Sequence, residues 1–175
     1  MGGYQGQDFS KEFTERTLKV LEQIETIQNE FEATTLVNLA LGLLIIPSEY
    51  VNGNRRDSNN KDVAINFLGS AQLKEVLQKE LPFHATSYYG EREGNSLNSM
   101  DYFDFLRLVR NGLAHGLIDF IGDPIQAVQI SNRKPNGQEN FRIQLPIDEF
   151  KDLMKRVAVL HVTLVESQHI KGGES

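Results

Sequence analysis

Residues 102–116 read YFDFLRLVRNGLAHG, and this stretch decides the fold because it combines a helical core pattern with the most chemically distinctive side chains of the chain. At 100° per residue its large apolar side chains fall within one narrow arc. They are Tyr102, Phe105, Leu106, Val109 and Leu113. Ser99 can cap the start of such a helix. The pattern therefore predicts an amphipathic helix with one buried face.

The polar residues of this helix avoid the apolar face. On a helical wheel with Tyr102 at 0°, Arg110 lies at about 80° and Arg107 at about 140°. Asn111 lies at about 180° and His115 at about 220°. A histidine moves a proton near neutral pH, an arginine neutralises phosphate charge, and an asparagine orients either group. This face is therefore a candidate site for phosphodiester chemistry.

A purely structural explanation accounts for the same residues. A charged His115 near a helix C-terminus is favoured by the helix dipole, and Arg107 can pair with Asp104 three positions earlier. Gly116 suits the position after a helix end, although Gly112 and Gly116 would also let a substrate backbone approach closely. Spacing alone favours a solvated polar face.

Hydrophobic periodicity assigns the rest of the chain. It predicts further helices over residues 10–31, 34–46, 70–81 and 148–166, with Pro47 ending the second of them. Turn-forming residues predict loops over 48–61 and 84–98. The period changes after residue 124, and it predicts a hairpin with strands 125–130 and 141–145 around the turn KPNG. Whether the second helix continues the first is left open.

These segments predict a single domain of mainly α class. A chain of 175 residues has the length of one domain built around one hydrophobic core. We expect a flexible leader over residues 1–9, a domain over 10–166 and a flexible tail over 167–175. The domain is predicted to be a bundle of four to five helices with a β-hairpin, at about 125–145, inserted before the last helix.

Composition excludes several classes of protein and site. Without cysteine the chain has no disulfides or zinc sites built on sulfur, and its histidines have no ligand-spaced partners, so no metal and no cofactor are expected. The net charge of −6 restricts any nucleic-acid contact to a local basic cleft. The longest apolar run, Leu36 to Ile46, is about half the length that spans a bilayer. We expect a cytoplasmic protein with no membrane partner.

Two further residues, His161 and Glu49, are possible members of the candidate site. His161 falls on the apolar face of the last helix, which favours a core histidine over a ligand. Glu49, just after the predicted helix end at Pro47, could enter the site, but no second feature of the sequence supports that role.

The sequence Arg110-Asn111, three residues and then His115 resembles the Arg-x4–6-His signature of the HEPN superfamily (higher eukaryotes and prokaryotes nucleotide-binding). The flanking residues LVRNGLAHG are similar to a helix end found in many members. The run from Thr34 to Pro47, the late hairpin and the closing helix resemble a plasmid- and mobile-element-associated bacterial branch of the superfamily.

The resemblance implies a helical domain that forms a homodimer, with two motifs meeting in one cleft, and a metal-independent endoribonuclease activity. His115 would assist attack of a ribose 2′-OH on the neighbouring phosphate, Arg110 would stabilise the phosphate, and Asn111 would orient either group. Arg107, an inference from the helix face, would add a phosphate contact. We expect a role as a toxin or defence effector, with an antitoxin or a nucleotidyltransferase-like protein as a candidate partner. The alternative is a noncatalytic module that binds RNA, nucleotide or a partner protein.

Overall fold

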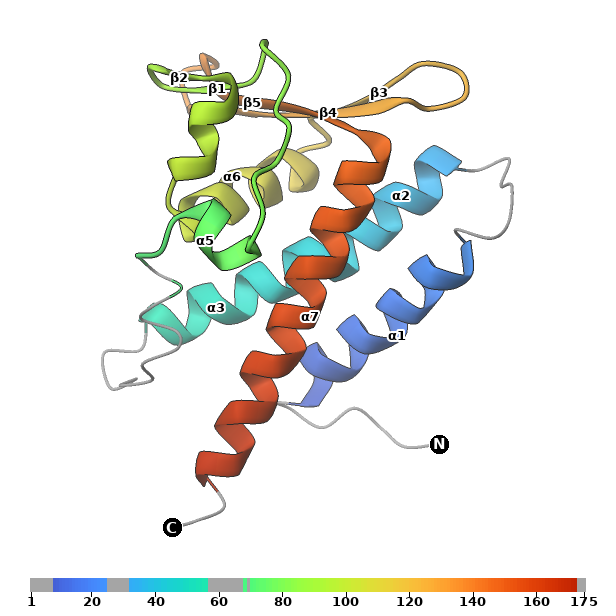
Figure 1. Cartoon of the computed structure of the whole chain (residues 1–175), viewed down its shortest axis with the longest axis vertical. Helices are drawn as coiled ribbons and strands as arrows, with labels where there is room; N and C mark the ends of the chain where they lie inside the picture. Colours follow the sequence, from blue (N-terminus) through green and yellow to red (C-terminus); the bar gives the residue numbers. More distant parts are fainter. Residues whose placement is uncertain (1–7, 25–31, 57–67, 69, 173–175) are drawn as a thin grey trace.

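The computed structural model describes residues 8–24, 32–56, 68 and 70–172, in which helices lie beneath a five-stranded antiparallel sheet (Figure 1). The helices are α1 (Asp8–Ile24), α2 (Glu32–Ala40), α3 (Ile46–Arg56), α5 (Leu73–Leu77), α6 (Tyr102–Ala114) and α7 (Ile147–Gly172). A π-helical turn, η1 (Leu41–Ile45), joins α2 to α3, and a 3-10 helix, η2 (Gly94–Ser99), precedes α6. The strands are β1 (Tyr88–Tyr89), β2 (Arg92–Glu93), β3 (Ile118–Ile121), β4 (Ala127–Arg133) and β5 (Glu139–Pro146).

The predicted fold class, a helical bundle with one inserted hairpin, is wrong in its β content. The predicted hairpin is present as β4 and β5, but it forms part of a sheet with the strand order β2-β1-β5-β4-β3. β3 pairs with β4 from Ile118 opposite Ile130, and β1 pairs with β5 from Tyr88 opposite Arg142. Strands of two and four residues are too short to show an alternating pattern, so the sequence does not reveal them.

Helix α6 lies between the sheet and the α2–α3 segment, and it forms the centre of the core (Figure 1). All five predicted core residues of α6 are buried, and Leu108 and Phe103 are buried as well because the sheet covers a second side of the helix. Its N-cap is Asp101 rather than Ser99. The Asp101 carboxylate accepts hydrogen bonds from the backbone N–H groups of Phe103 and Asp104 at 2.9 and 3.3 Å.

The helix that begins at Glu32 continues through Pro47, contrary to the prediction that Pro47 ends it. Within η1 the N–H of Ile46 bonds to the carbonyl of Leu41, five residues back. A wider π turn directly before proline accommodates a residue that has no N–H to donate and whose ring crowds a regular turn. The predicted loop is therefore helical over residues 48–56, and residues 57–61 lie outside the described residues.

The same helical segment is long and apolar enough, over Ala33–Val51, to cross a membrane by length and composition. Half of this stretch is buried inside the protein. Leu39, Leu43 and Leu44 belong to the core cluster that also includes residues of α6 and α7. The stretch is therefore packed as a core helix of a soluble protein is packed.

Three predicted helices differ from the observed ones in extent or orientation. The predicted helix 70–81 is reduced to α5, because Gln78 adopts a left-handed conformation with φ of 51°. On α1, Leu21 is buried whereas the neighbouring apolar residue Val20 is 44% exposed. The last helix is buried along its predicted face, with Leu160 only half-buried. Residues 1–7, 25–31 and 173–175, which include parts of the predicted first helix, leader and tail, lie outside the described residues.

Candidate functional site

A cleft of about 490 Å³ lies between α6 and the turn that connects β4 to β5. Its lining residues are Arg107, Leu108, Asn111, His115, Asn132, Arg133, Lys134, Pro135 and Asn140. Three of the four predicted site residues therefore share one cleft, and the fourth, Arg110, is not among its lining residues. Within the described part of the chain the lining contains three permanent cations and no carboxylate. Such a cleft suits an anion.

The α6 wall of the cleft presents Arg107, Asn111 and His115 at successive turns. His115 is the C-cap residue, and its N–H donates to the carbonyl of Asn111 at 3.1 Å, so the helical stacking extends to the imidazole. The ring is exposed, and Asn111 is half-buried. Neither side chain has a hydrogen-bond partner among the described residues. Both are therefore available to a ligand.

Arg107 makes the structural contact that the sequence offered as an alternative role. Its Nη2 and Nε lie 3.1 and 3.3 Å from Oδ1 of Asp104. Both side chains are more than a third exposed, and ion pairs of this kind contribute only about 0–1 kcal/mol to stability. The pair holds the guanidinium at the cleft without preventing it from binding a phosphate.

Arg110 faces α3 instead of the cleft. Its Nη2 lies 2.8 Å from Oε1 of Glu49, and its buried Nε has no hydrogen-bond partner in the described structure. Exposed Ala114 lies between Arg110 and His115 on the helical wheel, so the two motif residues flank one outward-facing surface. Glu49 is thus the residue that the sequence reasoning undervalued.

The second wall of the cleft was not predicted as part of the site. Asn132 and Arg133 stand at a β-bulge near the end of β4, and Lys134 and Pro135 follow in the turn. Nδ2 of Asn132 donates to the side-chain oxygen Oδ1 of Asn140 at 2.7 Å, which ties the two strands together at the cleft. The KPNG turn was visible in the sequence, but its position beside α6 depends on tertiary packing.

Gly112 packs α6 against the sheet, contrary to the expectation that it lets a substrate approach. A Cβ at this position would lie 2.5 Å from the carbonyl oxygen of Ser131 and 2.6 Å from Cγ2 of Ile130. Gly116 has a φ of +66° with open space beside it, as a residue just after a helix end often has. Of the two glycines, Gly116 is therefore the one with open space for a substrate backbone.

His161 is buried, as the sequence predicted for a core histidine. Its ring meets the ring of Tyr50 edge-on with 5.0 Å between centroids, and neither ring nitrogen has a hydrogen-bond partner in the described structure. Burial lowers the pKa of His161 to about 4, an effect that the backbone of Ser10 partly opposes. His161 is therefore a core residue that is not among the residues lining the cleft.

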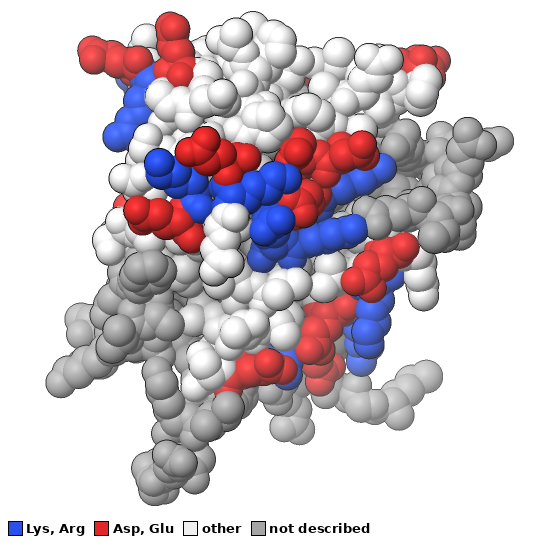
Figure 2. Space-filling view, in the orientation of Figure 1, with Lys and Arg blue, Asp and Glu red and all other residues white. Residues whose placement is uncertain are grey.

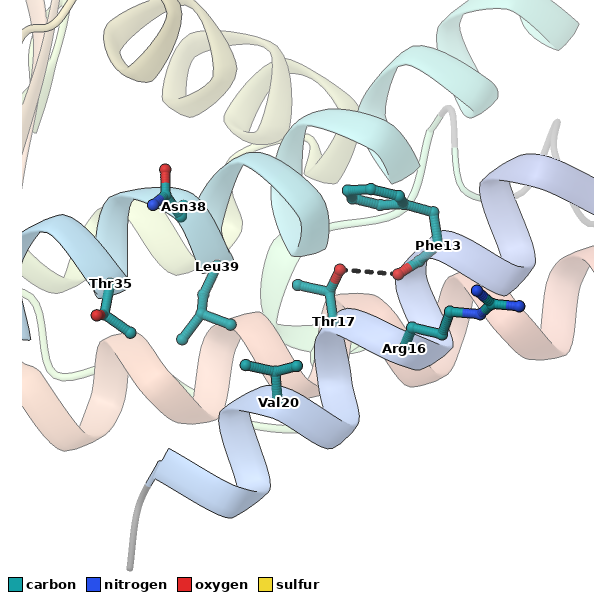
Figure 3. A pocket seen from close by; sticks show the side chains of 7 residues that line it. All are labelled: Phe13, Arg16, Thr17, Val20, Thr35, Asn38 and Leu39. Carbon is teal, nitrogen blue, oxygen red and sulfur yellow. Dashed lines mark hydrogen bonds between the residues drawn. The ribbon is translucent and has the colours of Figure 1, made fainter. Parts of the chain in front are cut away.

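A second hollow, of about 390 Å³, lies between α1 and α2 (Figure 3). Phe13, Val20 and Leu39 give it an apolar lining, and the Thr17 hydroxyl is bonded to the carbonyl of Phe13 at 2.8 Å. Its one charged lining residue, Arg16, pairs with Glu12. This hollow has no imidazole among its described lining residues, whereas the cleft beside α6 contains His115.

Comparison with known families identifies the family to which the chain belongs. A family model described as HEPN pEK499 p136 matches residues 1–168, which covers α6 and both walls of the cleft. No curated protein and no solved structure matches the chain. Because the match spans nearly the whole sequence, the chain belongs to the HEPN pEK499 p136 family, a plasmid-associated branch of the HEPN superfamily.

Proposed function

We propose that the protein is a metal-independent endoribonuclease that cleaves RNA through attack of a ribose 2′-OH on the adjacent phosphate. One observation carries this proposal: Arg107, Asn111 and His115 line a single cleft that has cations on both walls and no carboxylate among its described lining residues. Membership of the HEPN superfamily makes a nuclease or a nucleotide-binding module the expected class. The exposed imidazole favours the nuclease.

The chemistry assigns one task to each side chain. His115 accepts the proton of the 2′-OH as the new O2′–P bond forms. The P–O5′ bond breaks, which yields a 2′,3′-cyclic phosphate and a 5′-OH end. Arg107 and Arg110 stabilise the charge that builds on the phosphate, and Asn111 orients the phosphate or the imidazole.

A homodimer completes this site in the proposal. The leaving 5′ oxygen needs a proton, and a protonated His115 from a second copy supplies it when two α6 ends face each other. Arg110 bonds Glu49 through Nη2 and its Nε is buried, so in the proposal Nη1 is the atom that binds a phosphate spanning the two copies. Two-fold symmetry would place two exposed Ala114 surfaces against each other.

Cleavage of end-labelled single-stranded RNA in excess EDTA tests the proposal. His115→Ala and Arg110→Ala should each reduce the cleavage rate by a factor of about 100 or more, as the loss of a general base or a phosphate-stabilising donor does. Lys19→Ala, an exposed position on α1, is the matched control. Circular dichroism should stay unchanged because His115 is exposed. Full activity in either site variant would refute the assignment.

A second candidate function is a noncatalytic RNA-binding module. The ion pair between Arg110 and Glu49 favours it, because a committed guanidinium contributes less to transition-state stabilisation. In that case RNA stays intact, and it binds with a salt dependence that Arg107→Ala weakens.

The biological role that fits the nuclease is a cytoplasmic toxin or defence effector. An antitoxin or a nucleotidyltransferase-like protein would restrain it. Co-expression with the product of an adjoining gene tests this role: suppression of both RNA cleavage and growth arrest supports it, and growth unaffected by the protein alone contradicts it.

A further inference from the structure

We propose that the β4–β5 turn is the RNA-binding lip of the cleft, in which Arg133 and Lys134 bind phosphates of a single strand beside the phosphate held at α6. The inference rests on the proposed function for the identity of the ligand as RNA. It does not require that the RNA be cleaved. It assigns ligand contacts to residues outside the Arg-Asn-x3-His motif.

The turn is held in one conformation by its own hydrogen bonds. The N–H of Lys134 donates to the carbonyl of Gln138 at 2.8 Å, and the N–H of Gly137 donates to the carbonyl of Lys134 at 2.9 Å. The Asn136 side chain accepts from the N–H of Gln138 at 3.1 Å. A preorganised turn loses little conformational entropy on binding, so its cations are well placed to contribute affinity.

The two cations of the turn are exposed, although Glu139 lies opposite Arg133 across the two strands. Arg133 and Lys134 are exposed, and neither side chain forms an ion pair or hydrogen bond with a described residue. The nearby acid, Glu139, bonds both Tyr88 and Arg142, whose Nη2 lies 2.7 Å away. Burial raises the pKa of Glu139, but the hydrogen bonds from Tyr88 and Arg142, together with the positive charges of Arg142 and Arg133, outweigh it and lower that pKa overall. Oε1 of Glu139 is therefore bonded to Tyr88 and Arg142, whereas Arg133 interacts with this carboxylate through its charge alone.

Cations elsewhere on the molecule show a different arrangement. On the face in Figure 2, basic and acidic side chains lie beside one another over α7 and α1. Lys79 lies 2.6 Å from Glu149 and 2.9 Å from Asp152, and Arg156 also pairs with Asp152. Such neighbours cancel the attraction for phosphates, whereas the turn keeps its positive charge within an otherwise acidic chain.

The shape of the cleft favours a single strand over a duplex. Arg107 on one wall and Arg133 and Lys134 on the other enclose about 490 Å³. This space holds part of one strand, whereas duplex RNA presents its 2′-hydroxyls across a wide, shallow groove. The amides of Asn111 and Asn140 also line the cleft and can hydrogen-bond bases or riboses. A basic groove that follows one backbone is how proteins bind single strands.

The test measures binding of a fluorescent, fully 2′-O-methylated RNA 12-mer, which cannot be cleaved, over a series of salt concentrations. Arg133→Ala/Lys134→Ala should raise Kd about tenfold at low salt. It should also reduce the slope of log K against log salt by about 1.4, since each lost phosphate contact to a single strand removes about 0.7. Lys19→Ala/Arg16→Ala removes the same charge at exposed positions on α1, outside the lining of the cleft, and should change neither value.

The outcomes separate this inference from the nuclease proposal. If the wild-type protein cleaves RNA and the turn variant binds and cleaves RNA normally, the proposed role of the turn is wrong and the nuclease proposal stands. If RNA remains intact but the turn variant binds it weakly, the proposed role of the turn stands and the nuclease proposal is wrong. An equal loss in both double variants, tighter binding of a duplex 12-mer, or no binding by wild type overturns the lip. Since Arg133 and Lys134 are exposed, the thermal midpoint should stay unchanged.

Discussion

Nη2 of Arg110 lies 2.8 Å from Oε1 of Glu49, so the arginine of the motif is anchored to α3 while His115 faces the cleft at the end of α6. The Glu49 side chain is 53% exposed, which limits its contribution to stability to about 1 kcal/mol or less. The carboxylate therefore matters for the position and effective charge of Arg110 more than for folding.

Glu49→Gln should alter RNA handling in two opposite ways. Removal of the carboxylate leaves the charge of Arg110 uncompensated, so KM for RNA should fall by a few fold. The guanidinium loses its charged anchor, so kcat should fall about tenfold, as misplacement of a catalytic group does. Steady-state kinetics with wild type and with Glu22→Gln on α1 as control would check this. Unchanged kcat and KM would show that the pair is only a surface contact.

The stability of the protein should decrease in acid because of His161. The pKa of His161 is about 4 in the folded state and about 6.5 in the unfolded chain. Above about pH 6.5 His161 is neutral in both the folded and the unfolded state, so its titration does not reduce the free energy of unfolding. Between about pH 6.5 and pH 4 only the unfolded state gains a proton, so unfolding becomes easier by roughly 3 kcal/mol in total.

Urea denaturation across this pH range measures the effect. His161→Phe keeps an aromatic ring against Tyr50 and removes the titration, so its stability should vary less between pH 6.5 and 4. His84→Ala, an exposed position, should retain the wild-type pH dependence. Parallel curves for wild type and His161→Phe would contradict the assignment of this acid sensitivity to His161.

Gly112→Ala should destabilise the fold by about 1–3 kcal/mol, the usual cost of overpacking. The added methyl group meets the backbone carbonyl of Ser131, which cannot rotate away as a flexible side chain could. Thermal or urea unfolding measures the loss. Ala114→Gly tests the contribution of helix propensity alone on the same helix, and it should cost about 1 kcal/mol or less. A stable Gly112→Ala variant would show that α6 and β4 can separate.

Asp101→Ala should lower stability by about 1–2 kcal/mol, because the first turn of α6 then loses the acceptor for the N–H groups of Phe103 and Asp104. Asp101→Asn keeps an acceptor and should recover most of the difference. Ser99→Ala should have a smaller effect, since Ser99 bonds to the carbonyl of Ser96 rather than to α6. Chemical denaturation of the three variants distinguishes the true cap.

The sequence predicted α6 and the stacking of Arg107, Asn111 and His115 because a regular helix repeats its faces at a fixed angle. It did not predict the partner of Arg110. Glu49 follows a π turn and Pro47, and a π turn adds a residue that rotates everything after it by about 100° relative to a continuous α-helix.

The fold class was wrong for a related reason. β1, β2 and β3 form because neighbouring strands provide hydrogen-bond partners, and segments of two to four residues carry no pattern of their own. The same limit hid the second wall of the cleft. The second half of α6, all of β3 and most of β4 separate Arg107 from Arg133 and Lys134 in the sequence. Only the packing of α6 on β4 places these cations opposite Arg107.

The close approach of α6 to β4 at Gly112 fixes the helix relative to the strand, because the nearest atom is the backbone carbonyl oxygen of Ser131 rather than the end of a flexible side chain. Displacing the strand would carry the helix along with it. If the proposed function is correct, the fixed width of the cleft, rather than the opening of a gate, would decide which polynucleotide is admitted.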